Sequence, residues 1–152
     1  MVLKKELIAV GESFSSREEA LLTIANRFVD AGYARGSYPQ AIIERERVFP
    51  TGLPAEAFDI AISHCDSEHV LESAIGVSVL ERPVEFCMMG NLSDEPLHPI
   101  IIFMLAIKDP KCQVPTLQKM MEVIQNKHLL EQLRGAASEE EVFDLLAPAL
   151  KN

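Results

Sequence analysis

The residues of this chain that are best suited to chemistry are a histidine and an arginine on neighbouring predicted elements. His64 directly follows an apolar stretch, 58–63, which has the pattern of a short β-strand. A neutral imidazole is a nucleophile near neutral pH and can also act as a base. Arg45 lies in the preceding helical stretch, and its guanidinium can bind two phosphoryl oxygens at once. The pair predicts a phosphoryl-transfer site, with the imidazole open at the sheet edge.

Each of these two residues also has a purely structural interpretation. His64 could be a histidine at a strand end whose hydrogen bonds are satisfied within the fold. On a helical wheel of residues 38–49, Arg45 falls within the apolar stripe, and a buried guanidinium needs an acceptor. The acceptor could be a phosphoryl group or a structural carboxylate, or the side chain could extend past the core to water. The residues alone leave these alternatives open.

Three further polar residues are weaker candidates for lining the site. Thr51 lies in the Pro- and Gly-containing loop 50–54, which follows the helical stretch that carries Arg45. Glu68 and His69 follow His64 closely and could line the same site. They could equally belong to a polar loop.

A metal site and a thiol nucleophile are not predicted. His64, Cys65, Asp66 and His69 lie within six residues, and this crowding fits no standard zinc spacing. Cys65 neighbours His64, but adjacent strand residues point to opposite sides, so the imidazole is not expected to activate the thiol. The sequence also contains no phosphate-binding loop, dinucleotide fingerprint or hydrolase motif. We therefore expect no metal and no cofactor.

Charge and composition restrict the partners and the compartment. The formal net charge of −9 argues against nucleic acid and anionic membranes, because both attract clustered Lys and Arg. Three cysteines without a CxxC spacing predict neither a disulfide framework nor a zinc ribbon. Residues 1–6 lack the apolar core of a signal peptide, and the apolar run 99–107 is too short to span a bilayer. We expect a cytoplasmic protein without membrane insertion.

Hydrophobic periodicity and capping residues predict an alternation of strands and helices. A capping box at 16–19 begins a helix that ends at Gly32, and Ser37 is the predicted N-cap of the next helix. A second capping box, 138–141, begins the last helix. The predicted strands are 6–10, 58–63, 73–80, 84–89 and 100–107, and the predicted helices are 16–32, 38–49 and three more in the stretches 114–124, 129–133 and 138–150.

Two strands carry most of the information about the fold. The stretch 100–107 is apolar on both faces, which is typical of a central strand with helices on each side. The stretch 73–80 has only small residues on one face, which would let a helix or a ligand approach the backbone. The order of elements predicts an α/β fold, a three-layer α/β/α sandwich around a mixed β-sheet, in one domain of residues 1–152.

Several short motifs together resemble a known family. They are Ala-Gly-Tyr at 31–33, Ala-Ile-Ile-Glu-Arg-Glu at 41–46, Phe-Pro-Thr-Gly-Leu at 49–53, Ile-Ala-Ile-Ser-His at 60–64, and the apolar run 100–107 followed by Gln-Val at 113–114. Through them, over nearly the whole chain, the sequence resembles the enzyme IIA components of the bacterial sugar phosphotransferase system. The resemblance is to the fructose/mannitol class, and most closely to the galactitol-type branch.

The resemblance implies both an activity and a set of partners. His64 would be transiently phosphorylated, and Arg45 would steady the phosphoryl group. The donor would be phospho-histidine on the small carrier HPr. The acceptor would be a cysteine or histidine of a cognate IIB component, which serves the membrane component IIC. The sugar would be a galactitol-like polyol.

The chain departs from the family pattern at two places. Ser63 stands where the family usually has proline before the active histidine, a change expected to affect local rigidity. Residues 109–112 are Asp-Pro-Lys-Cys where several mannitol- and fructose-type members carry a second histidine. A two-histidine site would therefore need His69 or Lys111 in that role.

Two other functions compete with transport. A nitrogen-type regulatory domain would keep both residues but would signal its phosphorylation state to a protein partner, without a IIB component. A small binding module without phosphorylation follows if His64 is buried and inert.

Overall fold

The structure, a computed structural model, describes residues 3–91 and 94–150. The chain runs through five strands, five α-helices and three short 3-10 turns within these residues. In order they are β1 (Leu3–Glu12), α1 (Arg17–Asp30), α2 (Tyr38–Val48), β2 (Gly52–Pro54), β3 (Asp59–Ser63), η1 (Ser67–His69), β4 (Ala74–Leu80), η2 (Met89–Asn91), β5 (Ile101–Ala106), η3 (Pro110–Cys112), α3 (Gln113–Gln125), α4 (Lys127–Arg134) and α5 (Glu139–Leu150).

The strands form one mixed sheet in the order β1-β4-β5-β3-β2. β1 is parallel to β4 and β3 is parallel to β5, whereas β4 with β5 and β2 with β3 are antiparallel. The apolar strand β5 is central, as its sequence predicts. Its partner β3 brings His64 to the end of the sheet where the Thr51 loop enters β2.

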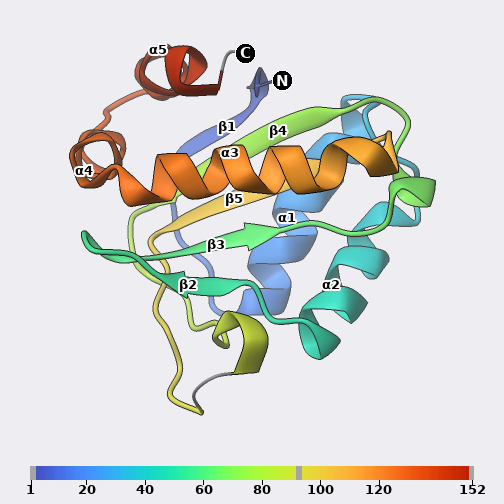
Figure 1. The fold of residues 1–152 in the computed structure, drawn as a ribbon, viewed down its shortest axis with the longest axis horizontal. Coiled ribbons are helices and arrows are strands. Elements are labelled where there is room, and N and C mark those ends of the chain that lie inside the picture. The colour runs from blue at the N-terminus through green and yellow to red at the C-terminus, as the bar shows by residue number, and fades with distance from the viewer. Residues whose placement is uncertain (1–2, 92–93, 151–152) are drawn as a thin grey trace.

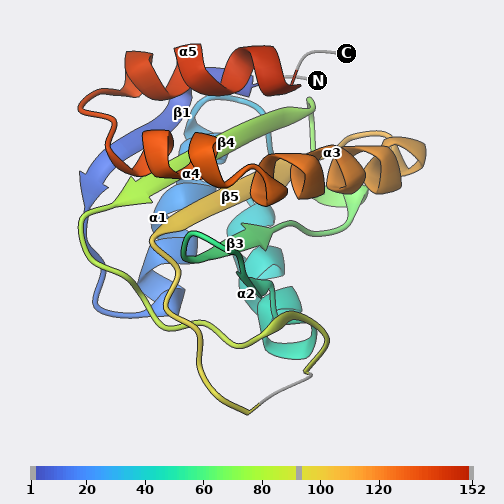
Figure 2. The same ribbon diagram turned by 60° about the vertical axis from the view of Figure 1, so that its left-hand side comes forward.

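Helices cover both faces of the sheet, which confirms the predicted three-layer arrangement. Figure 1 shows α3 in front of the sheet, with α1 behind it and α2 behind its right-hand end. The view in Figure 2 shows α4 continuing from α3, and α5 lying along β1. The sheet is therefore shielded from water where the apolar strands require it.

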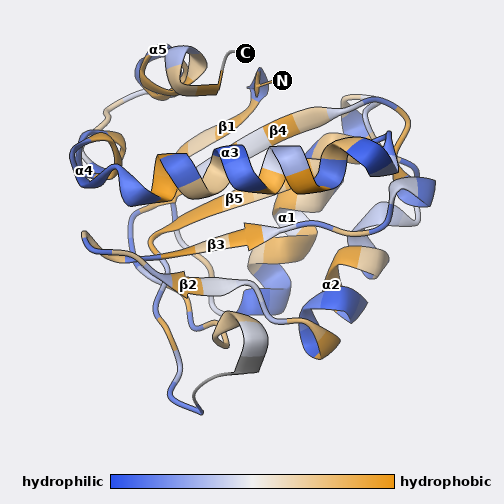
Figure 3. Ribbon diagram, viewed as in Figure 1, coloured by the Kyte–Doolittle hydropathy of each residue, from blue (hydrophilic) through white to orange (hydrophobic). Residues whose placement is uncertain are grey.

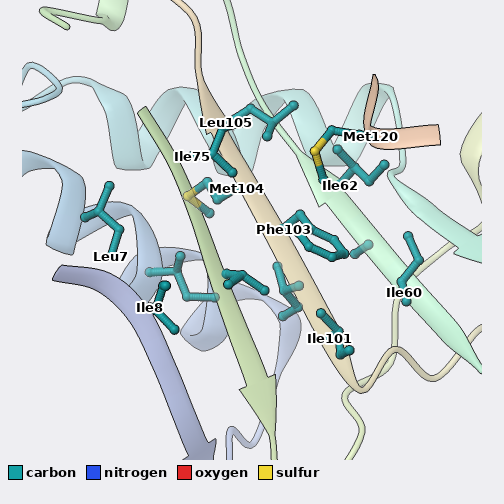
Figure 4. Packing of buried hydrophobic residues seen from close by; sticks show 14 of the residues in the cluster. Leu7, Ile8, Ile60, Ile62, Ile75, Ile101, Phe103, Met104, Leu105 and Met120 are labelled. Carbon is teal, nitrogen blue, oxygen red and sulfur yellow. The ribbon is translucent and has the colours of Figure 1, made fainter. Parts of the chain in front are cut away.

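The core follows the central strand. Every residue of β5 is buried, and the hydropathy colouring of Figure 3 shows β5 and much of β3 as apolar. Figure 4 shows Phe103 of β5 close to Ile60 and Ile62 of β3, with Met120 of α3 beside Ile62. The strand that ends at His64 is therefore fixed by apolar packing on both sides.

Small residues in β4 allow close packing, as predicted. A Cβ atom placed on Gly76 would lie 2.8 Å from the Leu7 carbonyl oxygen and 3.0 Å from Cζ of Phe28. Glycine is thus required where β1 and α1 meet β4. The element that packs on the small-residue face of β4 is therefore the helix α1.

The caps of α1 agree largely with prediction. The Ser16 hydroxyl accepts the Glu19 N–H at 3.1 Å, and Gly32 has a positive φ of 87° just beyond the helix end. The Tyr33 N–H then donates to the Phe28 carbonyl, which closes the helix. The second hydrogen bond of the capping box, from the Ser16 main-chain N–H to the Glu19 carboxylate, does not form. The Glu19 carboxylate accepts from the Ser15 hydroxyl instead.

Two other predicted caps are only partly correct. Ser138 accepts the Glu141 N–H, but the Glu141 carboxylate accepts from the main-chain N–H of Ala137. Ser37 occupies the N-cap position of α2, yet its side chain makes no capping bond. Its hydroxyl lies 2.8 Å from Nδ1 of His69 instead.

The predicted strand 84–89 is wrong. This segment makes only isolated bridges, Phe86 with Leu97 and Met88 with Gly52. The fifth strand is instead β2, in a stretch predicted to be a loop. A Cβ on Gly52 would lie 2.6 Å from the Cys87 carbonyl oxygen, so the chain at Cys87 approaches too closely for any larger residue.

None of the helices within residues 3–91 and 94–150 is both long and apolar enough to cross a lipid bilayer.

Candidate functional site

His64 lies immediately after β3, and its ring is oriented by the strand itself. The Nδ1 atom is 3.3 Å from the Ile62 carbonyl oxygen. A carbonyl can only accept a hydrogen bond, so Nδ1 carries the proton in this contact. The lone pair of the neutral ring is then on Nε2, and Nε2 is the nucleophilic atom.

The surroundings keep this imidazole neutral. Burial lowers the pKa of His64 below its ordinary value of 6.5, and the positive charge of Arg45 lowers it further. The Ile62 carbonyl and the Asp66 carboxylate oppose this shift without reversing it. A neutral imidazole keeps its lone pair at physiological pH, as nucleophilic attack requires.

A pocket of about 440 Å³ adjoins this ring. His64 and Ile62 both line it, as the strand alternation predicts, but His64 is only 7% exposed, so it is less open than expected. The other lining residues are Arg45, Phe49, Pro50, Thr51, Met89, Gly90, Leu117 and Met121. His64 and Arg45, the two residues singled out from the sequence, thus line one mostly apolar pocket.

Arg45 is placed differently from its predicted position in the apolar stripe of α2. Val48 and Phe49, the apolar residues at the end of this helical stretch, are 62% and 59% exposed. Arg45 lies at the edge of the buried face, with its side chain 30% exposed and 3.8 Å from an Asp66 carboxylate oxygen. The Arg45 guanidinium also lies 5.1 Å from the centre of the Phe49 ring. This cation–π contact helps to keep the guanidinium beside the pocket.

The Arg45 guanidinium keeps an unused donor. Its Nε atom is buried and makes no hydrogen bond with any residue in the described part of the chain. Such an atom is costly to leave without an acceptor. An incoming phosphoryl oxygen would supply that acceptor, and the fork geometry suits two oxygens.

Thr51 lines the pocket, as its predicted role requires, but its hydrogen bonds point away from it. Its hydroxyl donates to Oε1 of Glu46 at 2.6 Å, and its main-chain N–H donates to Oε2 at 2.8 Å. The same hydroxyl lies 3.3 Å from Oγ of Ser63. Thr51 therefore connects α2 to the end of β3.

His69 and Glu68 lie apart from the pocket. His69 lines a separate groove of about 280 Å³, which shares Arg45 and Phe49 with the pocket. Its Nδ1 faces Ser37 and its Nε2 is 3.9 Å from a Glu68 carboxylate oxygen. Glu68 is exposed and is not among the described residues that line either cavity.

Lys111 and its neighbours lie outside both cavities. The segment 109–112 forms η3 and the turn before it, and it is exposed. Lys111 is not among the residues that line the His64 pocket. The described part of the chain also contains no group of three or more His, Cys, Asp or Glu residues arranged to hold a metal ion.

Sequence reasoning missed several residues of the site. The buried residues of α3 include Met120 and Val123, whereas Val114 is exposed. Leu117 and Met121 of the same helix line the pocket and were not proposed as site residues. Glu46 was not proposed, although a carboxylate between the apolar positions of a helix is a signal for a buried polar contact.

The fold and the pocket, with a neutral imidazole beside an arginine donor, are features of a phosphoryl-carrying domain. The model of the family "Phosphoenolpyruvate-dependent sugar phosphotransferase system, EIIA 2" matches residues 1–148. The chain belongs to this family and is a phosphotransferase domain of EIIA type. This confirms the family resemblance derived from the sequence.

Relatives and solved structures agree with this assignment. The galactitol-specific EIIA component of Escherichia coli K12 is 32% identical over 123 residues, covering 81% of each chain. The nitrogen regulatory protein of Klebsiella oxytoca is 29% identical over 114 residues, covering 74% of this chain and 67% of that protein. The fold matches enzyme IIA of the mannitol system from Escherichia coli, solved in complex with phosphorylated enzyme IIB, with a TM-score of 0.77 at 24% identity, covering 97% and 99% of the two chains.

Proposed function

We propose that this chain, as a single domain of residues 1–152, accepts a phosphoryl group from phospho-HPr on Nε2 of His64. It then passes the group to a cognate IIB component for the uptake of a galactitol-like polyol. The observation that carries this proposal is the pairing of His64 and Arg45 in one pocket. Within residues 3–91 and 94–150, Nε2 of the imidazole makes no hydrogen bond and the buried Nε of Arg45 has no partner.

The transfer step follows from the tautomer of His64. The Nε2 lone pair attacks the phosphorus of the donor phosphohistidine, and a new N–P bond forms as the donor N–P bond breaks. The electrons of the broken bond return to the donor imidazole. The phosphorylated His64 ring becomes cationic, and its Nδ1–H bond to the Ile62 carbonyl stabilises that charge.

Arg45 serves the transferred group in this step. The phosphoryl oxygens carry negative charge throughout the transfer, so positioning and charge stabilisation are the main contributions of the protein. Arg45 would exchange its long contact with Asp66 for bonds to two phosphoryl oxygens. No metal is required for this role.

The rim of the pocket suits protein partners that bind in turn. The exposed apolar side chains of Phe49, at the end of α2, and Met121, on α3, line it, and exposed Val48 lines the adjoining groove. An apolar surface around a buried reactive atom excludes water when a partner covers it. HPr and IIB would bind here alternately, and IIC would be served indirectly through IIB. We infer a cytoplasmic location from this proposed set of partners.

A phosphoryl relay tests this function. Labelled phospho-HPr is mixed with the chain and then with IIB components of galactitol-, mannitol- and fructose-type systems. Acid-labile, alkali-stable label should appear first on this chain and then on one IIB. Transfer to the galactitol-type IIB supports the proposed sugar class. Absence of label on the chain would refute the phosphocarrier role.

The regulatory alternative has one observation in its favour, the similarity to the nitrogen regulatory protein. That role would keep the loading step but omit the acceptor. Loading from phospho-HPr with no transfer to any IIB would support it over sugar transport.

A further inference from the structure

A second carboxylate lies behind the pocket, in a position that the transfer step above does not use. Glu46 is only 6% exposed, although it is an acidic residue on a surface helix. Both of its carboxylate oxygens accept hydrogen bonds from Thr51, one from the main chain and one from the hydroxyl. Thr51 in turn lines the pocket that contains His64 and Arg45. One residue therefore separates the carboxylate from the space where a phosphoryl group would sit.

The hydroxyl groups beside Glu46 can adapt to either charge state of the carboxyl group. When Glu46 is ionised, the Thr51 hydroxyl donates to it and can accept from Ser63. When Oε1 carries a proton, it can donate to the Thr51 hydroxyl, which then donates to Ser63. Oε2 accepts the Thr51 N–H in both states. The loop and the strand end thus stay joined while the charge changes.

The charged groups around Glu46 do not lock it in one state. From α1, Arg17 lowers the pKa of Glu46 and Glu18 raises it. Arg45 of the same helix and His64 of the β3 end face the pocket on the other side of Thr51. Burial is the largest influence and raises the pKa of Glu46 to about 7, against the bonds from Thr51. The group can therefore gain or lose a proton near neutral pH.

We propose that Glu46 is a positioning residue that links phosphoryl loading of His64 to proton uptake. Glu46 acts through Thr51. This inference rests on the proposed phosphocarrier function. A phosphoryl group brings negative charge into the pocket, and a nearby buried carboxylate opposes that charge. Protonation of Glu46 removes the repulsion without breaking the connection through Thr51. Loading is consequently more favourable at lower pH.

The variant Glu46→Gln reproduces the neutral state. Its amide oxygen can accept the Thr51 N–H, and its NH₂ group can donate to the Thr51 hydroxyl. Glu44→Gln is the matched control, because Glu44 is on the same helix, is exposed and lines the His69 groove instead. Both substitutions replace a carboxylate by an amide on α2, but only Glu46 is buried and bonded to a residue of the pocket.

The test is the equilibrium of phosphoryl exchange with phospho-HPr, measured from about pH 6 to about pH 8 for the wild-type chain and both variants. We expect Glu46→Gln to match the wild type at about pH 6 and to be loaded at least about fivefold more favourably at about pH 8. Glu44→Gln should follow the wild type throughout. Equal ratios for Glu46→Gln and the wild type at every pH would overturn the linkage.

A second measurement on the wild-type chain avoids dependence on a folded variant. The carboxyl carbon of Glu46 is followed by NMR against pH, with and without the phosphoryl group on His64. The titration midpoint should move to higher pH on loading, and an unmoved midpoint would overturn the proposal. If the wild-type chain takes no label at any pH, the phosphocarrier function fails and this inference fails with it. Normal loading with an unmoved midpoint refutes the linkage alone.

Discussion

Arg45 lies between two cavities, and each contains one histidine. His64 lines a mostly apolar pocket, with Nδ1 at a carbonyl oxygen and no hydrogen bond from Nε2 to any residue that the structure describes. His69 lines a more polar groove, where Nδ1 faces a hydroxyl and Nε2 lies near the Glu68 carboxylate. The two rings share the same arginine as a neighbour. They differ in burial and in whether Nε2 has a partner.

Under the proposed function, this difference explains why His64 and not His69 would accept the phosphoryl group. In the His69 groove, a Glu68 carboxylate oxygen lies 3.9 Å from Nε2, the ring atom that a phosphoryl group would have to reach. An imidazole buried beside an arginine is kept neutral, and its proton is fixed on one nitrogen by a carbonyl. Proximity to Arg45 is therefore not sufficient. Under the proposed function, the burial of His64 contributes to its reactivity by keeping the ring neutral.

Removing each histidine in turn gives the strongest test of the comparison. His64→Ala should lower phosphoryl uptake from phospho-HPr by more than about a thousandfold, because the nucleophile is lost. His69→Ala should keep uptake within about twofold of the wild type. Gel-based transfer of labelled phosphate measures both. Comparable loss in the two variants would mean that the two cavities act as one site.

The arginine can be altered while its charge is kept. Arg45→Lys should slow phosphoryl transfer by about 10- to 100-fold, since an ammonium group cannot make the bidentate contact. Arg47→Lys is the control, because Arg47 is on the same helix and exposed to solvent. Rapid-quench kinetics with phospho-HPr would measure the rates. An unchanged rate for Arg45→Lys would show that only charge matters at this position.

The apolar character of the pocket rim can be tested with two equally exposed residues. Met121 lines the pocket and Leu22 lies on α1, and each is 39% exposed. Met121→Ser should weaken binding of HPr by about 3- to 10-fold, and Leu22→Ser should leave it unchanged. Titration calorimetry would measure the affinities. Equal weakening in both variants would argue against a rim that binds partners.

The smallest expected effect concerns stability at acid pH. The pKa of His64 is lower in the folded chain than its ordinary value of 6.5, so the unfolded state binds a proton first as the pH falls. The contribution of His64 to stability is thus full above pH 6.5 and decreases toward the folded pKa, by at most about 1.4 kcal/mol per pH unit.

The difference in unfolding free energy between wild type and His64→Gln isolates this contribution. Urea unfolding at several pH values should show the difference shrinking below about pH 6.5. If the difference in unfolding free energy between wild type and His64→Gln is the same at every pH, burial does not disfavour the charged ring.

The sequence predicted the pair His64 and Arg45 because two strong local patterns adjoin it. A strand of alternating apolar residues directly precedes the histidine, and a helical stretch predicted to begin after Ser37 carries the arginine. The central position of β5 was predictable for the same reason, since a stretch that is apolar on both faces needs cover on both sides. Such signals depend on neighbouring residues along the chain.

The remaining features of the site depend on contacts between distant segments. Glu46 is buried because Thr51 turns back to satisfy both of its oxygens, and no helical periodicity describes that contact. The apolar stretch 84–89 resembles a strand but finds only isolated bridge partners. Phe49 has core-like character, yet it lies exposed at the end of α2, at the pocket. The hydrophobic pattern of the sequence does not distinguish apolar residues on the pocket rim from apolar residues in the core.

The central claim is that one ring nitrogen of His64 carries the phosphoryl group. Loading the chain with phospho-HPr and recording ³¹P and ¹⁵N NMR spectra of the labelled imidazoles identifies both the residue and the nitrogen. The account predicts a phosphoryl group on Nε2 of His64, with a proton kept on Nδ1. A phosphoryl group on His69, or on Nδ1 of His64, would contradict it.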